Sequence, residues 1–212
     1  MHPYATNSGE RRIVIAVSAI TSIFLAYGLG CLTTAIQNAF HISLWWLDTP
    51  AVFGFFAILY AWFDRSLWKL SLSHRLGLVR VPDLNGTWAA EVKSQHDDDT
   101  THTTTVSIDQ TWTEICIGLQ SEHSRSDSVV AAILFPKPGE IVLTYQYNNE
   151  PSAHAATTMH AHRGTAWLCL RSERRIDHLE GDYYSGRDRQ NIGHIRLTRL
   201  AEAKSQAATG AR

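Results

Sequence analysis

The chain has 212 residues and a formal net charge of −1, a length that fits one membrane hairpin plus one small domain. Residues 1–82 carry six Lys and Arg against three Asp and Glu, whereas residues 83–200 carry eleven against sixteen. An acidic domain lacks the basic stripe that long DNA or RNA requires, so binding of a nucleic-acid polymer is disfavoured. Binding of a small anionic ligand by one or two arginines remains compatible with this charge. The three cysteines form no CxxC pair and no even framework, which disfavours disulfides and zinc.

Two apolar runs dominate the first third of the chain. Residues 1–12 are expected to form a flexible cytoplasmic tail. Residues 13–35 and 44–63 then each have about the 20 apolar residues that one helical crossing needs. The alternative is a cleaved signal peptide, or a lipoprotein site at Cys31. The first run is long for a signal, no A-x-A site follows it, and Cys31 lacks the preceding Leu of lipoprotein sites, so a retained two-helix transmembrane hairpin is favoured.

The charges that flank the two runs predict the topology. The loop between the runs has no Lys or Arg, whereas basic residues precede the first run and follow the second, so both termini are expected in the cytoplasm of a bacterial inner membrane. These basic residues are Arg11, Arg12, Arg65, Lys69, Arg75 and Arg80. Residues 64–82 are predicted to be an amphipathic linker, in which 66–81 forms either a basic interfacial helix or a plain linker helix.

After Pro82 the hydrophobic period changes from helical to strand-like. Eight or nine short alternating runs, separated by the turn signals HDDDT, FPKPGE, NNEPS, HRGT and SGRDRQN, fill residues 83–200. The sequence therefore predicts an all-β domain, an eight-stranded antiparallel up-and-down barrel of lipocalin-like form. Residues 201–212 are expected to be a disordered tail.

Alternation along the predicted strands indicates a polar and aromatic mouth of this barrel. Gln110, Tyr145, Tyr147 and Tyr183 follow aliphatic residues on inward faces. Such a mouth suits a base or ring that stacks and accepts a few hydrogen bonds. The alternative is that the tyrosines only fill the core, with their hydroxyl groups wet at the rim.

The sequence contains few patterns that indicate catalysis. GxSxG, HExxH, Walker and dinucleotide-binding motifs are absent from the sequence. His160 and His162 share a strand face but have no evident acidic or cysteine partner for a metal. A trio of Ser185, His162 and Asp182 is conceivable but is expected by chance. The sequence therefore predicts a protein that is not an enzyme and needs no metal or cofactor.

An ordered series of motifs gives the chain a family resemblance. The series is Q-T-W, S-x-S-x-S, Y-x-Y-x-N, H-x-G and G-x-Y-x-x-x-R, within segments such as PDLNGTW, LTYQYNNEP and LEGDYYSGRDRQNIGHIRL. Over residues 13–199 the chain resembles the membrane-anchored β-barrel effectors of cyclic-oligonucleotide-based antiphage signalling systems (CBASS). The resemblance implies a cyclic dinucleotide made by a partner nucleotidyltransferase, oligomerisation on binding, disruption of the inner membrane and death of the infected cell.

The resemblance also assigns ligand-binding residues where a motif stands in this sequence. Arg187 is expected to bind phosphate through its forked donors, aromatic rings to stack on bases, and Gln, Ser and Asn side chains to bind base edges. The expected ligand-binding residues are Gln110, Trp112, Ser126, Tyr145, Tyr147, Asn148, His162, Tyr183 and Arg187. Trp112 and Gly164 have structural alternatives, barrel closure and a tight turn. Two other functions stay open: a tethered lipocalin-like carrier of a lipid, and a membrane-anchored hydrolase that uses His162.

Overall fold

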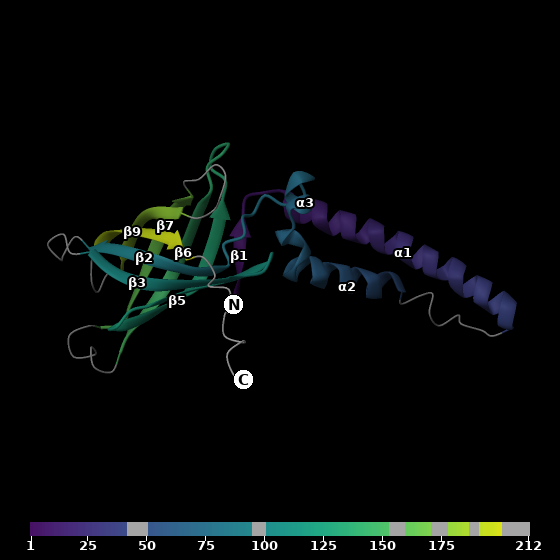
Figure 1. Cartoon of the computed structure of the whole chain (residues 1–212), viewed down its shortest axis with the longest axis horizontal. Coiled ribbons are helices and arrows are strands. Elements are labelled where there is room, and N and C mark those ends of the chain that lie inside the picture. Colours follow the sequence, from purple (N-terminus) through teal and green to yellow (C-terminus); the bar gives the residue numbers. More distant parts are fainter. Residues whose placement is uncertain (42–50, 95–100, 153–159, 171–177, 187–190, 201–212) are drawn as a thin grey trace, which may run out of the picture. The chain divides into compact units, whose positions relative to one another are not determined.

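The computed structural model describes residues 1–41, 51–94, 101–152, 160–170, 178–186 and 191–200 (Figure 1). These residues form two compact units. The helical unit is Ser8–Val81, and the barrel unit combines Met1–Asn7 with the chain from Pro82 onward. The tail expected at 201–212 lies outside the described residues.

The helical unit contains α1 (Glu10–Phe40), α2 (Ala51–Arg65), the 3-10 turn η2 (Leu67–Lys69) and α3 (Ser71–Arg75). At about 1.5 Å per residue, the 31 residues of α1 exceed the roughly 30 Å core of a bilayer. With a mean hydropathy of 2.1, α1 is the one helix in the described part of the chain that is long and apolar enough to cross a membrane. Large apolar side chains such as Ile23, Phe24 and Tyr27 are exposed along it.

The second predicted span, 44–63, is described only from residue 51. Its described helix, α2, has 15 residues, fewer than one crossing needs. Helix α2 packs against α1 within the helical unit. The structure thus provides one complete candidate span, and the second span of the expected hairpin stays a prediction.

The linker between α2 and the barrel contains less helix than the sequence predicts. The predicted helix over 66–81 is wrong in extent, because η2 and α3 are separate and Gly77 follows α3 with a φ of 68°, a conformation that glycine adopts without strain. The linker is joined to the start of α1, where the buried carboxylate of Glu10 accepts hydrogen bonds from the backbone N–H groups of Arg80 at 2.6 Å and Val81 at 3.3 Å.

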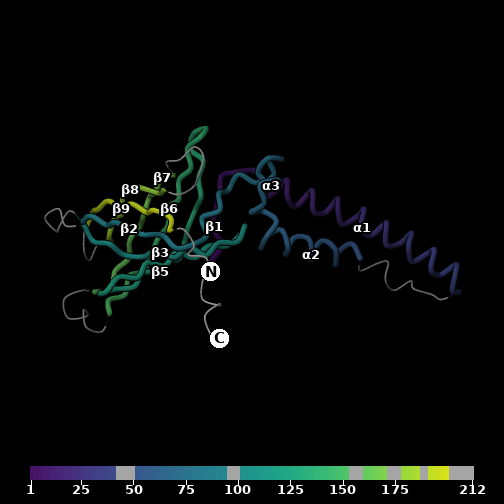
Figure 2. The backbone as a smooth tube through the Cα atoms, in the orientation of Figure 1, coloured from purple at the N-terminus to yellow at the C-terminus, as the bar shows by residue number. Residues whose placement is uncertain are grey.

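The barrel unit is a closed antiparallel barrel with one additional strand. In the described residues its strands are β1 (His2–Thr6), β2 (Gly86–Ser94), β3 (Thr101–Gln110), β4 (Glu114–Gln120), β5 (Ser124–Leu134), β6 (Val142–Pro151), β7 (His162–Leu170), β8 (His178–Ser185) and β9 (Ile192–Arg199). Each strand from β2 to β9 pairs with the next, and β9 pairs back with β2 (Figure 2). The predicted barrel is confirmed, with nine strands rather than eight.

The ninth strand, β1, lies where the sequence predicts a flexible tail. β4 and β5 pair directly only between Gly118 and Gln120 of β4, and β1 pairs with both strands beyond that point. The buried side chain of Tyr4 anchors β1 by donating its hydroxyl hydrogen to the carbonyl of Trp112 at 2.6 Å. The strand completes the wall between β4 and β5.

Two predicted turns are strand instead. HRGT, expected to separate two strands, is the beginning of β7, and NNEPS, expected after β6, lies mostly within it. The interior is filled by aliphatic residues at alternate positions, as the period of two requires. Fully buried examples are Ile108, Ile115, Ile133, Leu143, Leu168, Leu179 and Leu197.

Candidate functional site

A cavity of about 430 Å³ opens at one end of the barrel, within the range typical of small-molecule sites. Strands β2, β4, β6 and β8 end at this opening, which we call the mouth, and β3, β5, β7 and β9 begin there. Apolar side chains, including Ile117, Ala166 and Ile195, lie further from the strand ends. The described lining toward the mouth is mainly hydroxyl, amide, imidazole and phenol groups.

Three tyrosines line the cavity, as strand alternation predicts. Tyr145 and Tyr147 lie on β6 and Tyr183 lies on β8. The rings of Tyr145 and Tyr147 have centroids 6.2 Å apart and are tilted by 53°. Burial raises the pKa of Tyr145, and the neighbouring Tyr147 adds to the shift. Tyr145 therefore keeps its proton and presents a neutral hydroxyl.

An asparagine and a serine are joined at the mouth between β5 and β6. Ser126 donates its hydroxyl hydrogen to Oδ1 of Asn149 at 2.8 Å, and both side chains line the cavity. Asn148, assigned by the resemblance, is exposed and lies on the outer face of β6. The structure thus places Asn148 outside this cavity, because successive residues of a strand point to opposite faces. The inward position after Tyr147 is Asn149.

The three serines at alternate positions of β5 have different surroundings. Ser124, like Ser126, lines the cavity. Ser128 is buried and bonds elsewhere: its Oγ accepts from the N–H of Ile117 at 2.9 Å and lies 2.8 Å from Nε2 of His2. Ser128 therefore helps to hold β1 in place.

Gln110 and Trp112 lie at the other end of the barrel, which they help to close. The prediction that Gln110 is at the mouth is wrong, because β3 runs antiparallel to the direction of β6, so their last residues lie at opposite ends. Oε1 of Gln110 accepts from the N–H of Leu84 at 2.8 Å, and Nε2 donates to the carbonyl of Pro82 at 3.2 Å. Trp112 is buried and its carbonyl accepts from Tyr4. Neither residue lines the cavity, and we assign both to barrel closure.

His162 lies at the mouth, at the first residue of β7. It is buried, lines the cavity, and its Nδ1 is 3.1 Å from the carbonyl oxygen of His160. Gly164 is within β7 rather than in a turn, and a Cβ at that position would overlap the ring of Tyr147. The glycine therefore makes room for the tyrosine.

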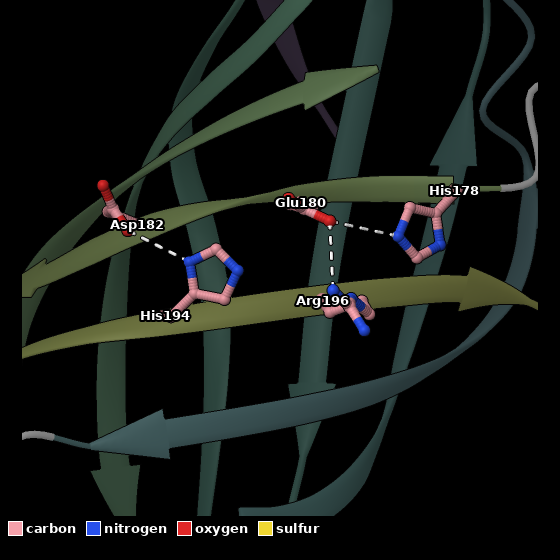
Figure 3. Close-up of polar contacts among 5 residues, drawn as sticks. All are labelled: His178, Glu180, Asp182, His194 and Arg196. Carbon is pink, nitrogen blue, oxygen red and sulfur yellow. Dashed lines mark hydrogen bonds and ion pairs between the residues drawn. The ribbon is translucent and has the colours of Figure 1, made fainter. Parts of the chain in front are cut away.

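The imagined hydrolytic trio does not form. Ser185 and His162 line the cavity, but Asp182 lies on the outer face of β8, where its Oδ1 is 3.1 Å from Nδ1 of His194 (Figure 3). The same face carries the pair of Glu180 with Arg196 at 3.4 Å. Asp182 and Glu180 thus join β8 to β9 on the outside. Among the described residues, no cluster of His, Cys, Asp or Glu is arranged to hold a metal.

The expected phosphate-binding residue, Arg187, lies outside the described residues. Among the described residues that line the cavity there is no Lys or Arg. The described groups that can donate to an anion are hydroxyl, amide and imidazole groups, among them His102 and His123, which the sequence did not single out.

Two further residues of the cavity were missed by sequence reasoning. Ser94 ends β2, and Asn191 immediately precedes β9; Nδ2 of Asn191 donates to Oγ of Ser94 at 2.7 Å. Asn149 was recoverable from alternation alone. Asn191 was not, because it stands in a segment read as a turn and carries no strand pattern of its own.

Comparison with known proteins identifies the family to which this chain belongs. Residues 79–199, more than half of the chain, match the family model described as Cap15, cyclic dinucleotide receptor domain. The chain belongs to the Cap15 family. It is 31% identical over 192 residues to CD-NTase-associated protein 15 of Yersinia aleksiciae, covering 90% of this chain and 89% of that protein.

A second relative of the Cap15 family is more distant. CD-NTase-associated protein 15 of Staphylococcus schleiferi is 26% identical over 159 residues, covering 73% of this chain and 81% of that protein. The resemblance seen in the motifs is thus confirmed: the chain is a member of the CBASS β-barrel effectors.

Proposed function

We propose that this protein is a CBASS effector whose cytoplasmic barrel binds a cyclic dinucleotide from a cognate nucleotidyltransferase. Binding promotes self-association, and the transmembrane segments then disrupt the inner membrane and kill the infected cell. The protein acts through binding and membrane contact, without catalysis or a cofactor. The observation that carries this proposal is the cavity at the mouth, with its three tyrosines and two asparagine–serine pairs.

The chemistry of the cavity fits a nucleotide better than a lipid. Tyrosine faces can stack on bases, and buried hydroxyl and amide groups discriminate strongly between ligands that do and do not hydrogen-bond to them. A lipid carrier would instead line the mouth with aliphatic side chains. The family match supports the same ligand class.

The position of β1 supports a helical unit that crosses the membrane and returns. Residues 1–7 and the chain from Pro82 onward belong to one barrel, so both lie in the same compartment. The helical unit between them then crosses any membrane an even number of times. If α1 is one crossing, the proposal calls for a second crossing that includes α2, and the flanking basic residues support a cytoplasmic location of both ends.

The ligand is tested with the full chain in lipid nanodiscs. Titration with a panel of cyclic di- and trinucleotides, followed by thermal shift and calorimetry, should identify at least one cyclic dinucleotide that binds and stabilises the barrel. Stabilisation by fatty acids with no response to any cyclic nucleotide would overturn the proposal and favour a lipid carrier.

Arg187 is proposed as the phosphate ligand. Arg187→Ala should abolish the response to the cyclic dinucleotide identified in the panel while the barrel stays folded. Arg125→Ala is the matched control, because Arg125 is exposed and paired with Asp127 at 2.8 Å on β5. Unchanged affinity of Arg187→Ala would remove this residue from the site.

The membrane step is tested in cells that make the activating nucleotide. A variant in which a Gly/Ser linker replaces residues 10–65 keeps β1 and therefore the complete barrel. It should still bind the ligand but lose toxicity. Toxicity that survives this replacement would show that the membrane is not the target.

A further inference from the structure

The wall of the cavity formed by β5, β6 and β7 carries a characteristic group of four residues. Ser126 and Asn149 are hydrogen-bonded between β5 and β6. Two positions before Asn149, Tyr147 lies opposite Gly164 of β7, and a Cβ on that glycine would overlap the tyrosine ring. We call these four residues the first set: an asparagine–serine pair beside a tyrosine that lies over a glycine.

The same combination recurs on β2, β8 and β9. Asn191 and Ser94 are hydrogen-bonded between the start of β9 and the end of β2. Tyr183 of β8 lies opposite Gly193 of β9, and a Cβ on that glycine would overlap the tyrosine ring. These four residues form the second set. Their side chains that line the cavity do so at the same mouth as those of the first set.

The strand order places the asparagine–serine pairs of the two sets on opposite walls. Around the barrel, the β5–β6 pair and the β2–β9 pair are separated by β7 and β8 on one side and by β3 and β4 on the other. A ligand that enters the mouth therefore meets an asparagine–serine pair on each of two facing walls, and each pair has a tyrosine on the same strand as its asparagine or on the adjacent one. A cyclic dinucleotide carries two bases on one closed sugar–phosphate ring, which matches two facing sites of similar chemistry.

The second set contains a polar atom that has no hydrogen-bond partner among the residues that the structure describes. Asn191 is only 4% exposed, and its Nδ2 donates to Oγ of Ser94. Its Oδ1 is buried and has no hydrogen-bond partner among the described residues. By contrast, Oδ1 of Asn149 already accepts from Ser126. Because buried acceptors without a donor are costly and rare, Oδ1 of Asn191 indicates a donor that arrives with the ligand.

We propose that the two sets each hold one base of a single cyclic dinucleotide, and that Oδ1 of Asn191 accepts a hydrogen bond from an N–H group on the edge of the base at its wall. Asn191 is then a specificity-determining residue, because a base that presents no donor there leaves the buried oxygen unsatisfied. This inference rests on the proposed function and adds which group of the protein reads one of the two bases.

The test pairs a protein variant with altered ligands. The probes are the cyclic dinucleotide that binds best in the panel and two analogues, each with the N–H donors of one base removed by methylation or by a base lacking them. For the wild-type chain in nanodiscs, removal of the donors from one base should weaken binding about tenfold through loss of the Asn191 contact. Asn191→Ala should bind this analogue and the parent with equal affinity. The affinity for the other analogue, relative to the parent, should be the same in the wild type and in Asn191→Ala.

Ser94→Ala is the matched control, because it removes the same hydrogen bond between protein side chains but keeps the asparagine oxygen. It should retain the discrimination between parent and analogue that Asn191→Ala loses. Should Asn191→Ala fold poorly, the two analogues measured on the wild type still decide the matter.

Each outcome bears on one claim. Equal affinity of the wild type for the parent and both analogues overturns the inference, as does undiminished discrimination in Asn191→Ala. In either case the wild type still binds the parent, and the proposed function stands. If the wild type binds no cyclic dinucleotide at all, the proposed function itself fails.

Discussion

Replacement of Gln110 by alanine distinguishes a residue that closes the barrel from one that touches ligand. The variant removes two hydrogen bonds, to the N–H of Leu84 and the carbonyl of Pro82, and both of these residues are buried. Each buried group left without a partner costs about 1–3 kcal/mol. Allowing for partial relaxation, we expect a loss of about 2–4 kcal/mol in the free energy of unfolding. For a domain of this size that lowers Tm by at least about 6 °C.

The assay is thermal unfolding of the full chain in a mild detergent, followed by near-UV circular dichroism, with hydrogen exchange of peptides from β2 and β3 as a local readout. Gln146→Ala is the matched control, because Gln146 is exposed on the outer face of β6; it should change stability by less than about 0.5 kcal/mol. The folded Gln110→Ala protein should bind the cyclic dinucleotide with wild-type affinity. An unchanged Tm together with lost binding would refute the structural assignment.

Three further predictions follow from the described contacts. Asn149→Ala should weaken binding of the cyclic dinucleotide about tenfold by calorimetry, whereas Asn148→Ala, on the outer face, should not; the reverse order would restore the original assignment. Tyr4→Phe should lower the free energy of unfolding by about 1–3 kcal/mol in urea, because it leaves the Trp112 carbonyl without its donor; no loss would mean that this bond does not hold β1. Burial raises the pKa of Tyr145 above its usual 10.0, so the folded state keeps a proton that the unfolded chain releases. Stability should therefore fall as pH rises above about 10, and Tyr145→Phe should flatten that slope in urea titrations at pH 9–11; an identical slope would exclude Tyr145 as its source.

Sequence periodicity predicted the features that repeat along a strand. Tyr145, Tyr147 and Tyr183 line the cavity because inward positions recur every second residue. The same alternation, continued two residues beyond Tyr147, predicts that Asn149 points inward. Asn148 is at an outward position by this rule. Alternation assigns a residue to the inner or outer face but gives no position along the barrel axis, so it could not place Gln110 at the closed end.

Local sequence patterns could not predict which segments pair over long distances in the chain. The strand at His2–Thr6 has five residues, and the bond from Tyr4 to Trp112 spans 108 positions. A segment this short has no periodicity that separates it from a tail, and only the gap between β4 and β5 explains why it is ordered. Asn191 is similar, since its place in the cavity depends on the pairing of β9 with β2, whose Ser94 stands 97 positions away in the sequence.

The N-terminal strand has a consequence for biosynthesis. β1 is made before the helical unit, whereas its partners β4 and β5 are made only after the whole helical unit. The barrel therefore cannot be completed until its first strand meets partners that are made after the helical unit. In the proposed two-span topology, an odd number of crossings would leave β1 on the wrong side of the membrane. The unpaired edges of β4 and β5 would then be exposed, and such edges promote aggregation. For the proposed membrane effector, completion of the barrel would thus depend on correct insertion of the helical unit.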